Sequence, residues 1–257
     1  MFYILFFILG AIFGSFLDCL IYRISREKSI LGRSFCINCN KILGFLDLVP
    51  IFSYIFLRGK CRYCKSKFGI EHFLVEFILG ILFVFGYWLF FSSNLWIYGN
   101  VIIGFVFYLI LVFLLSFIFI YDLKYYLVVD VFVYAGILLS IIFNLIMGSD
   151  FYSILYGIIL GVGFFGIQYL LSNGRWLGSG DILLGVFMGS LLGIKNTIVA
   201  IMICYFSGSI IGILFLIFKN KKMQSKIPLG PFISFGIFIS FIFGDQIIKW
   251  YFNLLGL

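Results

Sequence analysis

The chain has 257 residues, of which 64% are hydrophobic, 22% aromatic and 11% charged, and it carries a formal net charge of +8. Its mean hydropathy of +1.21 excludes a soluble globular domain, in which about 25% of the residues are charged. The positive charge does not indicate a nucleic-acid partner, because the basic residues sort by side of a bilayer. We therefore predict an all-α membrane protein that crosses the lipid bilayer several times.

Eight apolar runs are candidates for membrane-spanning helices. The first, from Phe2 to Tyr22, is long enough to cross at about 1.5 Å per residue. It lacks the leading positive charges and the cleavage site of a signal peptide, so we expect a retained helix. The run at 182–194 is short for about 30 Å of hydrocarbon, which predicts a shortened helix or one that begins near Trp176. The other runs lie at about 73–92, 99–121, 130–148, 151–171, 197–218 and 228–243.

The basic residues predict the orientation of these helices. Sixteen of the eighteen Lys and Arg residues lie at 23–70, 122–129, 172–181 and 219–227, segments that alternation of the spans puts on one side. By the positive-inside rule these segments are cytoplasmic, and both chain termini lie outside. We divide the chain into a first transmembrane helix (1–22), a cytoplasmic loop (23–70) and a transmembrane core (71–257).

The loop between the first two spans contains two C-x-x-C pairs, Cys36 with Cys39 and Cys61 with Cys64. Two such pairs complete a tetrahedral four-sulfur zinc site, which predicts a zinc-ribbon-like loop. Four protein ligands leave no open position for water, so we expect a structural metal. Reduced or redox-active cysteines are the alternative, and disulfides are disfavoured in a reducing cytoplasm.

The segment from Leu46 to Leu57, between the cysteine pairs, is too apolar for a solvated loop and too short to span. We expect it to lie along the membrane surface, interrupted by Pro50. Packing beneath the zinc site is the alternative.

Two aspartates fall at the same predicted face of the membrane. Asp122 follows the third span, and Asp181 stands behind Gly178 and Gly180 at the head of the sixth. An acid near hydrocarbon costs at least about 2.5 kcal/mol, which favours a functional role, although Asp181 can also cap the helix that follows. Two carboxylates at one depth are sufficient for aspartyl hydrolysis, with one taking a proton from water and the other polarising the scissile carbonyl. Because His72 is its only histidine, the chain has no zinc-protease H-E-x-x-H helix, and His-based Ser or Cys triads elsewhere in the chain are excluded.

Three other acids are candidates for the substrate path. Asp18 and Glu76 lie near the loop-side ends of spans one and two, where each can instead bond a neighbouring helix or reach Arg23. Asp130 starts span four, a position that favours capping of the helix over a place on the substrate path.

These residues, in this order, resemble the prepilin peptidases of type IV pilus, type II secretion and competence systems, which are GxGD-type intramembrane aspartyl proteases. Asp18, Val129 and Leu183 depart from the family pattern, standing where Asn, Pro and Lys are usual. The matching pieces are the run from Gly14 to Arg23, the two cysteine pairs, Pro50 with Ser53, Arg58-Gly59-Lys60-Cys61, Leu74-Val75-Glu76, Asp122 with Asp130, Gly178-Ser179-Gly180-Asp181, and Ile227-Pro228-Leu229-Gly230-Pro231-Phe232.

The resemblance implies that Asp122 and Asp181 form the catalytic pair in a bacterial cytoplasmic membrane. The implied substrate is a prepilin or pseudopilin whose short basic leader ends in Gly and is removed at the cytoplasmic face. Many relatives also N-methylate the new terminus from S-adenosylmethionine, an activity associated with the cysteine-bearing loop.

A non-enzymatic membrane protein is the alternative function: a proton-coupled carrier, or an assembly factor with a zinc-stabilised loop. A carrier needs acids near the middle of the bilayer, whereas Asp122 and Asp181 are predicted at one face. Leader cleavage in detergent and proton-coupled uptake into liposomes distinguish the two functions.

Overall fold

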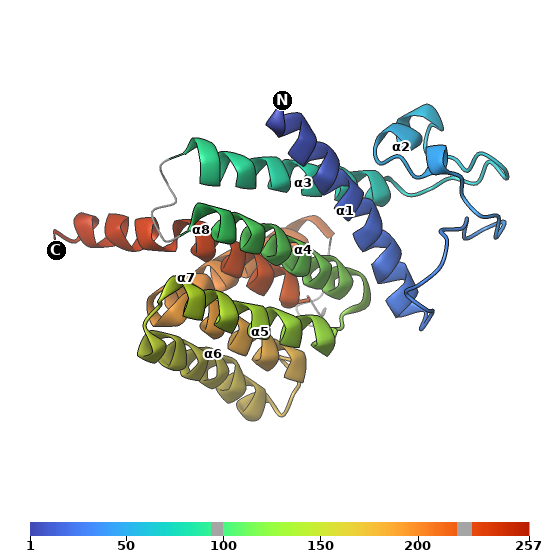
Figure 1. Cartoon of the computed structure of the whole chain (residues 1–257). Coiled ribbons are helices and arrows are strands. Elements are labelled where there is room, and N and C mark those ends of the chain that lie inside the picture. The colour runs from blue at the N-terminus through green and yellow to red at the C-terminus, as the bar shows by residue number, and fades with distance from the viewer. Residues whose placement is uncertain (94–99, 220–227, 257) are drawn as a thin grey trace. The chain divides into compact units, whose positions relative to one another are not determined.

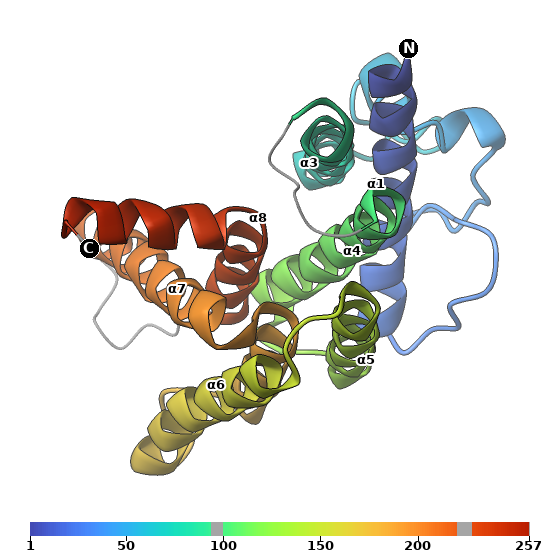
Figure 2. The ribbon, with the colours of Figure 1, turned by 60° about the vertical axis from the view of Figure 1, so that its left-hand side comes forward.

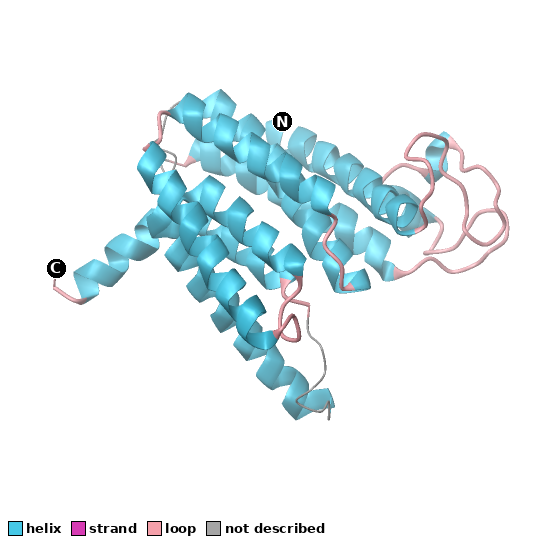
Figure 3. Cartoon of the chain, turned by 90° about the horizontal axis from the view of Figure 1, so that it is seen from below, coloured by secondary structure: helices cyan, strands magenta, loops and turns pink. Residues whose placement is uncertain are grey.

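The computed structural model describes residues 1–93, 100–219 and 228–256, and within them the chain is helical (Figure 3). The only β pairings in this part are two isolated bridges, Phe35 with Ile42 and Lys60 with Lys67. Seven described helices are long and apolar enough to cross a membrane. The predicted all-α membrane class is therefore confirmed. Residues 220–227, including most of a predicted cytoplasmic segment and Ile227 of the last motif, lie outside the described residues.

The chain divides into two units, Met1–Phe113 and Leu114–Leu257, which meet within α4. In Figure 1 the first unit runs from blue to green. Its elements are α1 (Phe2–Ser25), the short helices η1 (Phe45–Asp47) and α2 (Phe52–Phe56), α3 (Ile70–Tyr87) with a π-helical turn η2 (Trp88–Ser92), and the first half of α4 (Val101–Tyr125).

Helices α1 and α3 pack through glycines. A Cβ atom on Gly14 of α1 would lie 2.7 Å from the Cα atom of Glu76, and one on Gly10 would lie 2.9 Å from the Cα atom of Gly80. Small residues allow helix backbones to approach closely in lipid, where burial of apolar surface does not drive association. This contact fixes the start of α3, and with it Glu76, against α1.

The second unit contains the rest of α4 and four further helices. These are α5 (Asp130–Met147), α6 (Phe151–Ser172), α7 (Ser179–Lys219) and α8 (Gly230–Leu254). Figure 2 shows the first part of α7 beside α6 and its second part beside α8. Glycines again form the contacts: a Cβ on Gly157 of α6 would lie 2.8 Å from the carbonyl oxygen of Gly189, and one on Gly236 of α8 would lie 2.5 Å from that of Ala200.

Helix α7 is a hairpin of two helices broken at Gly193 (φ 65°, ψ 179°). A straight helix would separate Asp181 from Cys204 by about 35 Å, yet the two side chains lie within electrostatic range. The two halves of α7 therefore run in opposite directions, and the seven helices supply eight crossing segments, as predicted. The short sixth segment begins at Ser179 and not near Trp176, and the amide of Gly178, the residue before the helix, donates to the Asp181 side chain in its first turn.

Side chains satisfy the backbone groups that this break releases. Asn144 of α5 donates to the carbonyls two and three residues before Gly193, at 3.0 and 2.8 Å. The hydroxyl of Thr197 donates to the carbonyl of Gly193 at 2.6 Å, and the amide of Ile194 donates to the Ser153 hydroxyl at 3.4 Å. Because hydrocarbon offers no hydrogen bonds, a broken helix persists in a membrane only with such partners.

Candidate active site and cysteine cluster

Asp122 is buried near the end of α4, where it is joined to the start of α8. Its Oδ2 atom accepts a hydrogen bond from the amide of Gly230 at 2.8 Å. Gly230 is the first residue of α8, and amides in the first turn of a helix have no partner within that helix. Asp122 therefore satisfies a donor that α8 itself cannot use.

Only glycine fits at position 230 without movement. A Cβ atom there would lie 2.5 Å from Oδ2 and 3.0 Å from Cγ of Asp122. The sequence analysis identified the motif that contains Gly230, but the motif did not indicate that the Gly230 amide binds Asp122. The available signal was a glycine followed by a proline at a helix start, where a free amide is expected.

Asp181 is buried in the first turn of α7 and binds the residue that precedes the helix. Its Oδ2 atom accepts from the amide of Gly178 at 2.9 Å, which is one half of a capping box. A Cβ atom on Gly180 would lie 2.8 Å from the Cβ atom of Val128, so glycine lets the α4–α5 connection lie against the start of α7. The capping alternative thus describes the geometry of Asp181, and it leaves the second carboxylate oxygen for other contacts.

The two carboxylates belong to the second unit and interact electrostatically. Among the described residues, neither Oδ1 atom makes a hydrogen bond, whereas each Oδ2 atom is held by a backbone amide. Asp181 lies in the first turn of α7, and Asp122, in the last turn of α4, contacts the first amide of α8; the positive end of a helix dipole stabilises negative charge. Such a pair can bind a water molecule and exchange protons with it.

Asp130 does not cap α5, contrary to the capping alternative. Its side chain is exposed at the first position of α5, and Val129 occupies the capping position without a side-chain hydrogen bond. A capping side chain must precede the helix to reach its free amides, and Asp130 is one residue too late.

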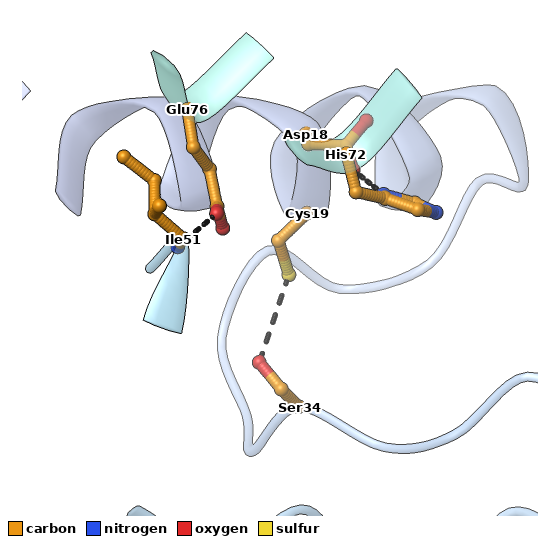
Figure 4. Close-up of polar contacts among 6 residues, drawn as sticks. All are labelled: Asp18, Cys19, Ser34, Ile51, His72 and Glu76. Atoms are coloured by element: carbon orange, nitrogen blue, oxygen red, sulfur yellow. Dashed lines mark hydrogen bonds and ion pairs between the residues drawn. The ribbon is translucent and has the colours of Figure 1, made fainter. Parts of the chain in front are cut away.

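Asp18 and Glu76 lie in the first unit (Figure 4). Asp18 of α1 is directed at His72 of α3 and forms an ion pair when the histidine is protonated. The Oε2 atom of Glu76 accepts from the amide of Ile51 at 2.6 Å. Asp18 thus bonds a neighbouring helix, and the buried Arg23 donates instead to carbonyls of the loop, including that of Gly32 at 2.8 Å.

These acids line a cavity of about 190 Å³ in the first unit. The cavity lies between α1, α3 and the cysteine-bearing loop. Its lining includes aromatic side chains as well as the acids, among them Tyr22, Phe35, Tyr54 and Phe68.

The four loop cysteines converge on one point. Their sulfur atoms all lie within 4.8 Å of one another, and those of Cys36 and Cys64 are 3.8 Å apart. Tetrahedral zinc with bonds of about 2.3 Å places its sulfur ligands about 3.8 Å apart. The cluster therefore has the dimensions of a four-sulfur metal site.

The two cysteine pairs have the same backbone geometry. The amide of Cys36 donates to the carbonyl of Lys41 at 3.0 Å, and that of Cys61 to the carbonyl of Ser66 at 2.8 Å. The fourth residue after each of these cysteines, Asn40 and Lys65, has a positive φ. Each pair thus sits in the same tight turn, which points its sulfur atoms inward.

Ser66 is a residue of this cluster that the sequence did not reveal. Its hydroxyl lies 3.0 Å from the sulfur of Cys64, and hydrogen bonds from Ser66, Cys61 and Cys39, of which those from Ser66 have the largest effect, lower the pKa of Cys64 to about 6. A lowered pKa favours the thiolate, which is the form of cysteine that binds metal.

Comparisons with known proteins agree with the motifs. The family model described as Bacterial Peptidase A24 N-terminal domain matches residues 8–90, and that of the Type IV leader peptidase family matches residues 109–217. No solved structure matches the chain significantly.

Curated relatives match along nearly the whole chain. A prepilin leader peptidase/N-methyltransferase of Bacillus subtilis is 27% identical over 250 residues, covering 96% of this chain and 97% of the relative. Proteins of the same name from Legionella pneumophila and Vibrio cholerae are 25% and 36% identical. The first match covers 91% of this chain and 82% of the relative, and the second 41% and 44%.

Proposed function

Because this chain belongs to the type IV leader peptidase family, we propose that it is an intramembrane aspartyl endopeptidase that removes the short basic leader from type IV prepilins or pseudopilins. Cleavage follows a glycine at the cytoplasmic face of the membrane. The observation that carries this function is the pair of buried carboxylates, Asp122 and Asp181, within electrostatic range of one another and each bound by a backbone amide at the start of a helix. Because the chain belongs to a peptidase family, we no longer favour the alternative function of a carrier or an assembly factor.

The proposed mechanism uses one ionised and one protonated aspartate. The ionised carboxylate takes a proton from water as the water oxygen attacks the scissile carbonyl, and the protonated one donates to the carbonyl oxygen. The C–N bond then breaks as the leaving amine receives the proton that the first carboxylate took from water, and the hydroxyl of the tetrahedral intermediate returns a proton to the second carboxylate. The amides of Gly178 and Gly230 hold one oxygen of each carboxylate, so the other oxygen is free to face water and substrate.

The location that fits this function is the bacterial cytoplasmic membrane, with both termini outside and the loop at 23–70 in the cytoplasm. The support is the concentration of Lys and Arg in alternate connections. In this orientation Asp122 and Asp181 lie at the cytoplasmic ends of their helices. The basic leader remains in the cytoplasm, and its cleavage site reaches the aspartates at the membrane surface.

Zinc is the metal that suits the cysteine cluster, held by Cys36, Cys39, Cys61 and Cys64. The spacing of the sulfur atoms supports it, and four thiolates are a common ligand set for structural zinc. The metal supplies a crosslink that folds a loop with little core of its own. It takes no part in hydrolysis.

We infer N-methylation of the new amino terminus as a second activity, supported by the cavity of the first unit. S-adenosylmethionine supplies a methyl group from a sulfonium cation. The rings of Tyr22 and Tyr54 line the cavity together with the acids Asp18 and Glu76 and with basic side chains, among them Arg23. The aromatic rings are the groups that attract such a cation. Mass spectrometry of the cleaved pilin tests this activity through the mass of one added methyl group.

The decisive experiment replaces each aspartate by asparagine and measures leader release from a prepilin in detergent. Asn keeps the shape and some hydrogen bonding but cannot exchange a proton, so Asp122→Asn and Asp181→Asn should each lower cleavage by orders of magnitude. Asp130→Asn is the control, because that side chain is exposed and makes no cap. Full cleavage by Asp181→Asn would rule out an aspartyl mechanism. Loss in Asp130→Asn with activity kept in Asp122→Asn would show that Asp130 is the partner acid.

A further inference from the structure

The loop that carries the cysteines exposes an apolar ridge on the short helices η1 and α2. Phe45 and Phe56 are 84% and 79% exposed, values that few large apolar side chains retain in water. Five exposed large apolar side chains within twelve residues of the chain indicate a partner that covers them. The ridge consists of Phe45, Leu46, Phe52, Ile55 and Phe56.

Two contacts fix the ridge to the first two turns of a membrane-spanning helix. The amide of Ile51 binds Glu76, and the ring of Tyr54 lies 5.6 Å from that of Phe73 (Figure 4 shows the first contact). Phe73 and Glu76 are the fourth and seventh residues of α3, about 5 and 9 Å along the helix from its start. The headgroup region of a bilayer leaflet is about 5–8 Å thick. The anchors therefore hold the segment at the level where α3 enters the membrane.

The backbone between η1 and α2 is strained at Ile51, and the hydrogen bond from Ile51 to Glu76 holds it in that conformation. Ile51 has φ 64° and ψ −55°, a conformation that a β-branched residue rarely adopts. Such a residue persists only where its surroundings impose it, and here the buried Glu76 holds the Ile51 amide. The helix α2 begins at the next residue, so this contact sets the course of the ridge relative to α3.

The charges around the ridge are those that a bilayer surface attracts. Exposed basic side chains follow α2 immediately, beginning with Arg58 and Lys60 and continuing with Lys65 and Lys67. Basic residues next to a membrane are attracted to anionic phospholipid headgroups. An apolar face with adjacent cations is the pattern of an interfacial membrane-binding segment.

We propose that the apolar ridge is inserted in the boundary between headgroups and acyl chains of the leaflet that α1 and α3 enter. Its partner is the lipid surface, with anionic phospholipid near the basic residues that follow α2. The cysteine-bearing loop then lies along the bilayer as a third attachment beside the two helices. This inference is independent of the catalytic activity.

Hydroxyl-radical footprinting of the unmodified protein tests the proposal in nanodiscs of phosphatidylglycerol and phosphatidylethanolamine. Tyr63 belongs to the same loop, is aromatic and is 43% exposed, so it is a matched reference. If water surrounds the loop, Phe45 and Phe56 should be oxidised more than Tyr63 after correction for intrinsic reactivity. With the ridge in lipid the order reverses, and we expect at least a fivefold lower oxidation of the two phenylalanines. Oxidation in the order of exposure would overturn the proposal.

A photocrosslinker identifies the occupant directly. p-Benzoylphenylalanine in place of Phe52 or Phe56 should give phospholipid adducts in the same nanodiscs, and in place of Tyr63 it should give few. Adducts with a second copy of the chain or with added prepilin, in place of lipid, would assign the ridge to a protein partner and refute lipid insertion. Footprinting requires no substitution, so it decides the matter even where a substituted protein folds poorly.

Discussion

Replacing Gly230 by alanine tests how the proposed catalytic Asp122 is held. The added Cβ atom would lie 2.5 Å from Oδ2 of Asp122, against at least 3.4 Å for an ordinary contact, so the two must separate by roughly 0.9 Å. That shift breaks the 2.8 Å hydrogen bond from the Gly230 amide. A hydrogen bond to a charged group contributes about 1.5–3 kcal/mol. We therefore expect a loss of about 12- to 140-fold in kcat/KM, at about 1.4 kcal/mol for each factor of ten.

The assay is leader release from a prepilin in detergent, with kcat and KM determined separately. Because the hydrogen bond positions a reacting group, the loss should appear in kcat, with KM changed little. Gly166→Ala in α6 is the matched control, since its Cβ atom has nothing within 4 Å and should leave the rate unchanged. Wild-type kcat in Gly230→Ala would show that Asp122 needs no such donor. An equal loss in Gly166→Ala would show that added methyl groups disturb the helices in general.

The metal, the orientation and the helix packing give three more predictions. Purified protein should contain about one zinc ion, and changing Cys61 and Cys64 together to serine should abolish the metal; unchanged zinc content by elemental analysis would exclude this site. In intact cells a membrane-impermeant maleimide should label Lys195→Cys but not Arg26→Cys, both exposed positions outside the cysteine cluster, and labelling of Arg26→Cys alone would reverse the orientation. Gly161→Leu should lower thermal stability strongly, because any side chain there meets the backbone of α7, whereas a melting temperature within a degree of wild type would contradict this packing.

The spans and the placement of the two aspartates were accessible from the sequence because they depend on local patterns. Apolar runs of sufficient length give the helices, and alternation of sides then puts Asp122 and Asp181 at one face. The two C-x-x-C pairs likewise imply convergence, since each turn brings its own two sulfur atoms together. None of these inferences requires knowledge of which distant residue a particular side chain contacts.

Contacts between distant residues were not accessible in the same way. The hydrogen bond from Gly230 to Asp122 joins positions 108 residues apart. The apolar pattern of α4 does not indicate that Gly230 binds Asp122, and neither does that of α8. The pairing of Asp18 with His72 is similar, because it depends on how α1 and α3 rotate against one another. The positive φ of Ile51 runs against the preference of a β-branched residue and follows from its anchor on Glu76.

Helix starts were the least predictable local feature. The capping interpretation failed for Asp130 because Val129 takes the position before the helix. The sixth segment starts at Ser179 and not near Trp176, because Asp181 binds the amide of Gly178 and closes the first turn there. In both places a shift of one to three residues decides which amide a carboxylate can reach.

The bond between Gly230 and Asp122 also sets an order of events during synthesis of the chain. Asp122 and Asp181 are translated well before α8, so a nascent chain holds both acids while the amide that binds the first of them does not yet exist. A buried carboxylate without its donor is unfavourable, and the arrival of α8 relieves this. If the two acids are the catalytic pair, as proposed, the pair is complete only after α8 has entered the membrane. We therefore expect partly inserted chains to hydrolyse substrate more slowly than the finished protein.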